Sequence, residues 1–210
     1  MPPEPHNQYY FLALDQGSLS SRALLFDENA EIVFSASKKI NTLRTKKVIE
    51  YNAEEIFHSL RTCIDEVMFR LEKKLAGDSR NFTVKASLIT QRSTIVCWNR
   101  FSGEALGPAI SWQDTRDSQW LEENRSRITP HISKTGLRLS PHYGANKIRW
   151  CVQNLPKVIQ ANLDNALVYG PLASFLLFRL TQEHTFAIDP ANASRTLLYD
   201  NTTQQWDDAL

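Results

Sequence analysis

The chain of 210 residues can form one large domain or two small ones, with a substantial core. Its 42% hydrophobic and 22% charged residues are typical of a soluble globular protein, and a net charge of +1 argues against nucleic-acid or membrane-surface partners. Cys63, Cys97 and Cys151 lack metal-ligand spacing, so we expect free thiols in a reducing compartment. No apolar run approaches transmembrane length and no signal-peptide core is present, so we expect a cytoplasmic protein.

The N-terminal part predicts a short antiparallel meander. Residues 1–8 hold three prolines and no apolar pattern, which indicates a flexible tail. Apolar strands are predicted at 9–14, at 22–26 and from 31 to about 37, and the tight turns between them make neighbours antiparallel. The stretch 38–49 is basic and without periodicity, and is predicted to be a loop.

A long amphipathic helix is predicted next. Asn52 is a suitable N-cap, and acidic residues follow it in the first turn. One face of this helix is apolar, at steps of three and four residues: Ile56, Leu60, Cys63, Ile64, Val67, Leu71 and Leu75. Gly77 is expected to end the helix.

The remainder of the chain predicts further strands and then mostly helices. Strands are expected at 84–90, 94–99 and 108–112. From Thr115 the pattern is mostly helical, with a loop at 137–141, helices at 145–154 and 171–180, and an ambiguous stretch at 191–198.

The segment between the first two strands carries groups suited to phosphate and magnesium. Its sequence is Asp15-Gln16-Gly17-Ser18-Leu19-Ser20-Ser21-Arg22. A glycine lets the backbone approach a ligand closely, and backbone N–H groups with hydroxyls in such a turn can hold phosphate oxygens. A carboxylate at a strand end can bind Mg²⁺, which prefers oxygen ligands. The alternative is an ordinary hairpin in which Asp15 and Gly17 serve only the turn.

Three further stretches place polar groups at the ends of elements, where ligands commonly bind. They are Thr90–Thr94, Ile110–Asp114 and Pro141–Lys147. Arg92 and Trp112 suit recognition of a polyol, although each also fits a structural role, as a surface ion pair and a core aromatic respectively. We expect Lys147 to be a solvated charge. The chain has no P-loop, dinucleotide, zinc-protease or nucleophile-elbow motif.

Taken together, these stretches resemble the FGGY family of carbohydrate kinases, and within it the glycerol kinases. The matching segments, in the family's order, are 13–22, 89–94, 110–116, 146–150 and 192–198. The resemblance implies an α/β fold of the ribonuclease H-like, actin-like ATPase type, a mixed sheet with an antiparallel three-strand meander plus helices. Residues 9–210 would form the N-terminal lobe, and the second lobe would lie outside this chain.

The resemblance also implies roles for individual residues in ATP-dependent phosphorylation of a sugar or polyol hydroxyl. Asp15 would help to hold Mg²⁺, and the ATP phosphates would be bound by Gly17, Ser18, Ser20 and Arg22. The substrate would be bound by Arg92, Ser93, Trp112, His142 and Tyr143. The general base and most of the adenosine site would belong to the second lobe, so the isolated lobe is expected to be inactive; a homo-oligomer is left open.

The chain departs from the glycerol kinase pattern in three places. Ser18 and Leu19 stand where the phosphate loop has two threonines, Ser93 stands where the family has a glutamate, and His142, with Tyr143 beside it, stands where the family has a tyrosine. Because the last two would read the substrate, we expect a small polyol or sugar other than glycerol. A catalytically silent sugar-binding or regulatory protein of the same fold is the alternative. A ribonuclease H-like nuclease is disfavoured, since only Asp15 is well placed for the metals that it would need.

Overall fold

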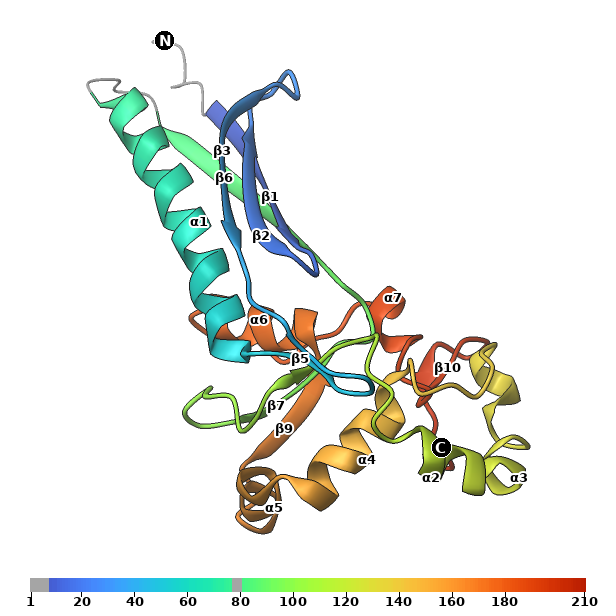
Figure 1. The fold of residues 1–210 in the computed structure, drawn as a ribbon. Helices are drawn as coiled ribbons and strands as arrows, with labels where there is room; N and C mark the ends of the chain where they lie inside the picture. The colour runs from blue at the N-terminus through green and yellow to red at the C-terminus, as the bar shows by residue number, and fades with distance from the viewer. Residues whose placement is uncertain (1–7, 77–80) are drawn as a thin grey trace. The chain divides into compact units, whose positions relative to one another are not determined.

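The computed structural model describes residues 8–76 and 81–210. Contacts along the chain group them into two compact units, coloured by residue number in Figure 1. The first unit contains the described residues up to Ile40 and those from Glu55 to Thr90, and the second contains Asn41–Glu54 and Gln91–Leu210. Of the expected flexible tail at 1–8, residues 1–7 lie outside the described part, and Gln8 begins the first strand.

The first unit holds a four-stranded mixed sheet in the order β3-β2-β1-β6. Its strands are β1 Gln8–Gln16, β2 Ser20–Phe26, β3 Ile32–Lys39 and β6 Phe82–Thr90. β1, β2 and β3 pair antiparallel, which confirms the predicted meander, and β6 runs parallel to β1.

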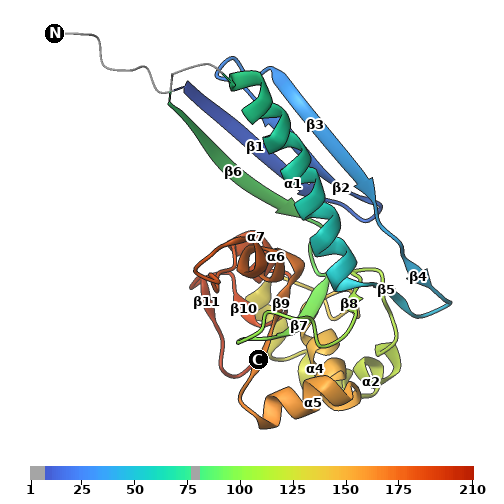
Figure 2. The ribbon, with the colours of Figure 1, turned by 90° about the vertical axis from the view of Figure 1, so that its left-hand side faces the viewer.

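One face of this sheet is buried by helix α1, Ala53–Leu75, which runs along it in Figure 2. Tyr10, Leu12 and Leu14 alternate on the buried face of β1, as the period of a strand requires. The apolar stripe predicted for the helix is confirmed at five fully buried positions: Ile56, Leu60, Cys63, Val67 and Leu71. The expected helix end at Gly77 lies outside the described residues.

Asn52 caps the start of α1, since its Oδ1 accepts a hydrogen bond of 3.0 Å from the Glu54 N–H. We expect Asn52→Ala to lower the free energy of unfolding by about 1 kcal/mol, because a backbone donor of the first turn loses its partner. Chemical denaturation followed by far-UV circular dichroism measures the change. Asn52→Asp keeps the acceptor and should stay within a few tenths of a kcal/mol of the wild type; equal losses in both variants would contradict the capping role.

The second unit is built on a five-stranded antiparallel sheet in the order β4-β5-β8-β7-β9. The strands are β4 Leu43–Arg44, β5 Ile49–Tyr51, β7 Ile95–Asn99, β8 Ala109–Ile110 and β9 Leu167–Pro171. The prediction of a loop over 38–49 was therefore wrong: β3 extends to Lys39, and two short strands follow. Strands of two and three residues are too short to show an alternating pattern.

Helices form much of the rest of the second unit. They are α2 Ser118–Glu123, α3 Arg125–Ile128, a 3₁₀ turn at Ile132–Thr135, α4 Gly144–Asn154, α5 Pro156–Leu163, α6 Leu172–Leu180 and α7 Pro190–Ala193. A hairpin of β10 Tyr199–Asp200 and β11 Gln205–Trp206 follows. The helices expected from Thr115 onward are confirmed, whereas α5 and β9 were not predicted. Trp98 is buried in this unit, and its ring contacts those of Phe175 and Phe178.

All three cysteines are free and buried, as expected for reduced thiols. Among the helices of residues 8–76 and 81–210, none combines the length and apolar character needed to cross a bilayer.

Candidate functional site

The turn between β1 and β2 is closed by its own backbone. The Gly17 N–H donates to the Ser20 carbonyl oxygen at 3.0 Å, and Leu19 at the tip is 77% exposed. A Cβ added to Gly17 would meet that carbonyl oxygen at 3.5 Å, an ordinary contact, and its φ is not among the positive values of the described chain. The turn itself therefore does not require glycine, and close approach of a ligand is the remaining reason for one.

The two faces of this hairpin carry different chemistry. Gln16 and Ser21 are cross-strand partners on the buried face, where the Ser21 hydroxyl donates to Gln16 Oε1 at 2.6 Å. Asp15 and Arg22 are the next cross-strand pair, and their side chains form an ion pair on the opposite face. Ser20 shares that face with Arg22 by alternation. The hairpin thus presents a carboxylate, a guanidinium and a hydroxyl together, away from α1.

The acceptors on this face are compatible with Mg²⁺ bound to a nucleotide. In the described part of the chain no three His, Cys, Asp or Glu side chains are grouped to hold a metal. The Asp15 carboxylate is 31% exposed, and Mg²⁺ characteristically takes one or two protein carboxylates, with phosphates and water completing its shell. A single carboxylate therefore fits magnesium that arrives with ATP, and the metal-binding role of Asp15 remains a prediction.

One residue of this face was missed by the sequence reasoning. Lys39 is the cross-strand partner of Ser20 and is exposed, so it places a second cation beside the hydroxyl. The sequence does show two adjacent lysines at residues 38–39. Because a loop was predicted there, no strand pairing placed Lys39 opposite Ser20.

In the second unit the structure brings together three of the predicted substrate residues. The rings of Trp112 and His142 lie 5.6 Å apart, and those of His142 and Tyr143 lie 5.0 Å apart, both edge to face. The Trp112 N–H donates to Thr94 Oγ1 at 3.2 Å, which ties this aromatic residue to the loop after β6. We call Trp112, His142 and Tyr143 the aromatic cluster.

Arg92 and Ser93 lie in the same loop but differ in exposure. Arg92 is exposed, whereas Ser93 is 2% exposed and its hydroxyl has no hydrogen-bond partner. Ser93 also has a φ of 65°, a left-handed conformation that is uncommon for a residue with a side chain. Its role in substrate binding stays a prediction.

Cations surround the aromatic cluster. The guanidinium of Arg195, which the sequence reasoning did not select, lies 5.9 Å from the centre of the Tyr143 ring. Burial lowers the pKa of His142, and the positive charges of Lys147, Arg195 and Arg92 lower it further. His142 therefore remains neutral to lower pH than an ordinary histidine.

Lys147 is buried, which corrects the expectation of a solvated charge. It is 2% exposed, and its ammonium donates to the carbonyl oxygens of Pro141 at 3.1 Å, of Tyr143 at 3.3 Å and of His142. These bonds tie the loop that carries His142 and Tyr143 to α4. Burial lowers the pKa of Lys147 from 10.5 to about 7, the Asp114 charge acting in the opposite direction.

This buried amine should make stability depend on pH. Between about pH 7 and about pH 8.5 the unfolded chain keeps the Lys147 proton that the folded protein has released, so the free energy of unfolding should rise with pH. The contribution approaches about 1.4 kcal/mol per pH unit. Other shifted groups change the pH dependence of stability outside this window. His142, whose pKa is lowered, contributes below its ordinary pKa of 6.5, and Cys63 and Cys97, whose pKa values are raised, contribute above about 9.

Lys147→Met isolates the effect. Urea denaturation at several pH values within that window should give the variant a smaller slope of stability against pH than the wild type. Equal slopes would contradict the lowered pKa. Lys157→Met, at an exposed position of α5, is the control and should keep the wild-type slope.

An ion-pair network supports the backbone beside Trp112. Asp114 accepts hydrogen bonds from the Ile49 N–H at 2.6 Å and from the Arg116 guanidinium at 2.8 and 3.0 Å. Arg116 also pairs with Glu50 on β5 at 2.5 Å. The network joins the segment after β8 to β5 and fixes the path of the chain at Trp112.

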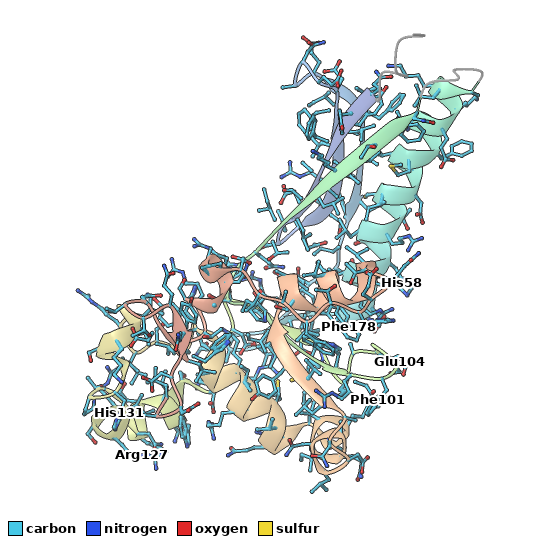
Figure 3. All side chains as sticks on the ribbon, turned by 180° about the vertical axis from the view of Figure 1, so that it is seen from behind. His58, Phe101, Glu104, Arg127, His131 and Phe178 are labelled. Carbon is cyan, nitrogen blue, oxygen red and sulfur yellow. The ribbon has the colours of Figure 1, made fainter. Side chains whose placement is uncertain are left out.

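Two cavities of the second unit lie apart from the aromatic cluster. One of about 440 Å³ is lined mainly by apolar residues of β9, α6 and the C-terminal hairpin. The other, of about 540 Å³, lies beside α3 and includes Arg127 and His131, both labelled in Figure 3. Neither cavity is lined by Arg92, Trp112 or His142.

Comparisons with known proteins identify the family to which this α/β fold belongs. The sequence model of the FGGY family of carbohydrate kinases, N-terminal domain, matches residues 10–210. The chain belongs to this family. The expected fold class, a mixed α/β lobe of the actin-like type, is confirmed.

Individual relatives support the assignment. The chain is 35% identical over 208 residues to the glycerol kinase of Nitratidesulfovibrio vulgaris and 37% identical over 207 residues to that of Acinetobacter baylyi, covering 96% of this chain and 40% of each relative. The crystal structure of Plasmodium falciparum glycerol kinase with ADP superposes with a TM-score of 0.84 at 31% identity, over 97% of this chain and 40% of that one. A gluconate kinase from Lactobacillus acidophilus, 22% identical with a TM-score of 0.75, shares the fold. The chain thus spans about two fifths of these relatives.

Proposed function

We propose that this chain is the substrate- and phosphate-binding lobe of an ATP-dependent kinase that phosphorylates a hydroxyl of a sugar or polyol. The observation that carries the proposal is the family match over residues 10–210, in which the outward face of the β1–β2 hairpin supplies acidic, basic and hydroxyl groups. Proteins similar to this chain include glycerol, gluconate and xylulose kinases, which supports a sugar or polyol as its substrate class.

The hairpin would handle the phosphates. Arg22 is paired with Asp15, and it would exchange this partner for phosphate oxygens, which a guanidinium binds in a bidentate manner. Ser18 and Ser20 would donate hydroxyl protons to the same oxygens. Asp15, released from the ion pair, would hold magnesium, which when bound neutralises charge on the phosphates of the transferring group.

The aromatic cluster and Arg92 would orient the substrate. The indole face of Trp112 suits the apolar side of a polyol, and the Arg92 guanidinium can donate to its hydroxyls. The carbonyl bonds of Lys147 keep His142 and Tyr143 in position. We propose that a second lobe supplies the general base that removes the proton of the substrate hydroxyl, as well as most of the adenosine site.

Phosphorylation assays on the full-length form, with ATP and Mg²⁺ against a panel of polyols and sugars, test the proposal. We expect ATP-dependent turnover with at least one compound, and little or none from residues 1–210 alone. Absence of turnover across the panel, with a folded protein, would refute the kinase assignment.

A further inference from the structure

A chain of hydrogen bonds links helix α1 to the turn between β1 and β2. The Gln16 side-chain N–H donates to the Gly17 carbonyl oxygen at 3.2 Å, and the Ser21 hydroxyl donates to Gln16 Oε1 at 2.6 Å. The Ser21 hydroxyl is also hydrogen-bonded to that of Ser59 on α1. The backbone of the turn is therefore connected to the helix through the Gln16 amide, all within the first unit.

The Gln16 amide is buried, which calls for an explanation. Gln16 and Ser21 are both 0% exposed, on a face of the sheet where the buried neighbours along β1 are Leu12 and Leu14. Burying an amide is costly unless its donor and acceptor are both hydrogen-bonded. Replacing a buried hydrogen-bonded pair with apolar groups of the same shape can be nearly neutral. Packing alone therefore does not require a glutamine at this position.

Three carbonyl oxygens of the turn are held by donors of the same unit. The Gly17 carbonyl accepts from Gln16, the Leu19 carbonyl accepts from the Ile40 N–H at 3.1 Å, and the Ser20 carbonyl accepts from the Gly17 N–H at 3.0 Å. Turns that hold anions present N–H groups to them, whereas a carbonyl oxygen turned toward a phosphate would repel it. Donors that hold these carbonyls keep them from turning toward such a ligand.

Among these three donors, that of Gln16 is the one that belongs to a side chain. It acts on the Gly17 carbonyl, where the backbone rotates more freely than at other residues. The C=O and N–H groups of a trans peptide point in opposite directions. Holding the Gly17 carbonyl toward the Gln16 amide therefore aims the Ser18 N–H, which belongs to the same peptide, away from that amide.

We propose that Gln16 is a positioning residue for the nucleotide phosphates, because its buried amide keeps the Gly17 carbonyl turned away from them. The inference rests on the proposed function, in which this turn binds the phosphates of ATP. Gln16 acts through the Gly17–Ser18 peptide and is itself anchored by Ser21 and Ser59. Its loss should weaken binding of the phosphates and leave recognition of the adenosine and of the sugar or polyol unchanged.

Calorimetry on the full-length protein in the presence of Mg²⁺ tests this inference, with ADP and AMP as the probes. AMP lacks the terminal phosphates and serves as the reference ligand. Gln16→Met keeps a side chain of similar size and removes both hydrogen bonds of the amide. We expect the dissociation constant for ADP to rise about 3- to 10-fold, as for the loss of one net hydrogen bond, and that for AMP to stay at the wild-type value. In activity assays the KM for ATP should rise and the KM for the sugar or polyol should not.

Two further variants separate positioning from a general effect on the fold. Ser59→Ala interrupts the chain of hydrogen bonds at α1, and it should raise the dissociation constant for ADP about 2-fold or more. It gives the same readout should Gln16→Met fail to fold. Leu71→Ala is the control, because Leu71 is fully buried on α1 about three helical turns beyond Ser59. It should lower the Tm by loss of packing and keep the wild-type affinity for ADP.

The outcomes distinguish this inference from the proposed function. Wild-type affinity for ADP in both Gln16→Met and Ser59→Ala would overturn the inference and leave the phosphate-binding role of the turn in place. An equal loss of affinity for ADP and AMP, or a similar loss in Leu71→Ala, would assign Gln16 to the fold alone and also overturn it. If the wild type does not bind ADP, the proposed function itself fails, and the inference fails with it.

Discussion

Replacing Asp114 by alanine should lower the free energy of unfolding of the second unit by about 3–5 kcal/mol. The side chain is 1% exposed and accepts bonds from the Ile49 N–H and from Arg116. Its removal leaves a buried N–H and a partly buried guanidinium without this partner, and such groups are costly to bury unpaired. All five tryptophans belong to this unit, so urea denaturation followed by tryptophan fluorescence reports its stability directly.

Two further variants test whether the large loss of stability depends on the burial of Asp114. Glu122→Ala breaks a similar carboxylate–guanidinium pair with Arg125, at side chains 67% and 53% exposed, and should change stability by less than about 1 kcal/mol. Asp114→Asn keeps one acceptor oxygen and should cost less than the alanine variant. If Asp114→Ala and Glu122→Ala have equal effects, the network is not what holds this segment.

The first sheet was predictable because its signals are local. Short apolar runs define β1 and β2, and the tight turns that follow them fix the antiparallel order of β1, β2 and β3. The stripe of α1 likewise gave both the helix and its buried face. Each of these features depends on the residues of one continuous segment, which a single sequence contains.

The second sheet was not predictable in the same way. β4 and β5 pair through the backbone, over segments too short to show a period. β9 joins β7, although about seventy residues separate them in sequence. Pairings of this kind are decided by tertiary packing, which overrides local preference.

The candidate site shows the same division between local and long-range information. The hairpin residues were identified from one continuous segment, whereas Trp112 and His142 came together only through the family resemblance. Lys147 was misjudged because its acceptors are main-chain carbonyls, which leave no trace in the residue types. Arg195 was passed over because its place beside the Tyr143 ring, about fifty residues earlier in the chain, follows from the fold and not from its neighbours in sequence.

Asp15→Ala should lower kcat/KM of the full-length protein about 10²- to 10³-fold, the range for loss of one group that stabilises developing charge. The proposed function assigns Asp15 to magnesium, so Mg²⁺-dependent binding of ADP, measured by calorimetry, should weaken with it. Stability should change little, because the Asp15–Arg22 pair is exposed and such pairs contribute about 1 kcal/mol or less.

Asp65→Asn is the matched control, since it breaks another exposed carboxylate–arginine pair of the first unit, with Arg61 on α1. It should leave both kcat/KM and ADP binding at wild-type values. If Asp15→Ala keeps its Mg²⁺-dependent ADP binding, Asp15 does not bind the metal and has only a structural role in the hairpin. If the wild type binds sugars without turnover and Asp15→Ala binds them equally well, the catalytically silent sugar-binding protein becomes the better description, because only phosphoryl transfer requires a metal-binding carboxylate at this position.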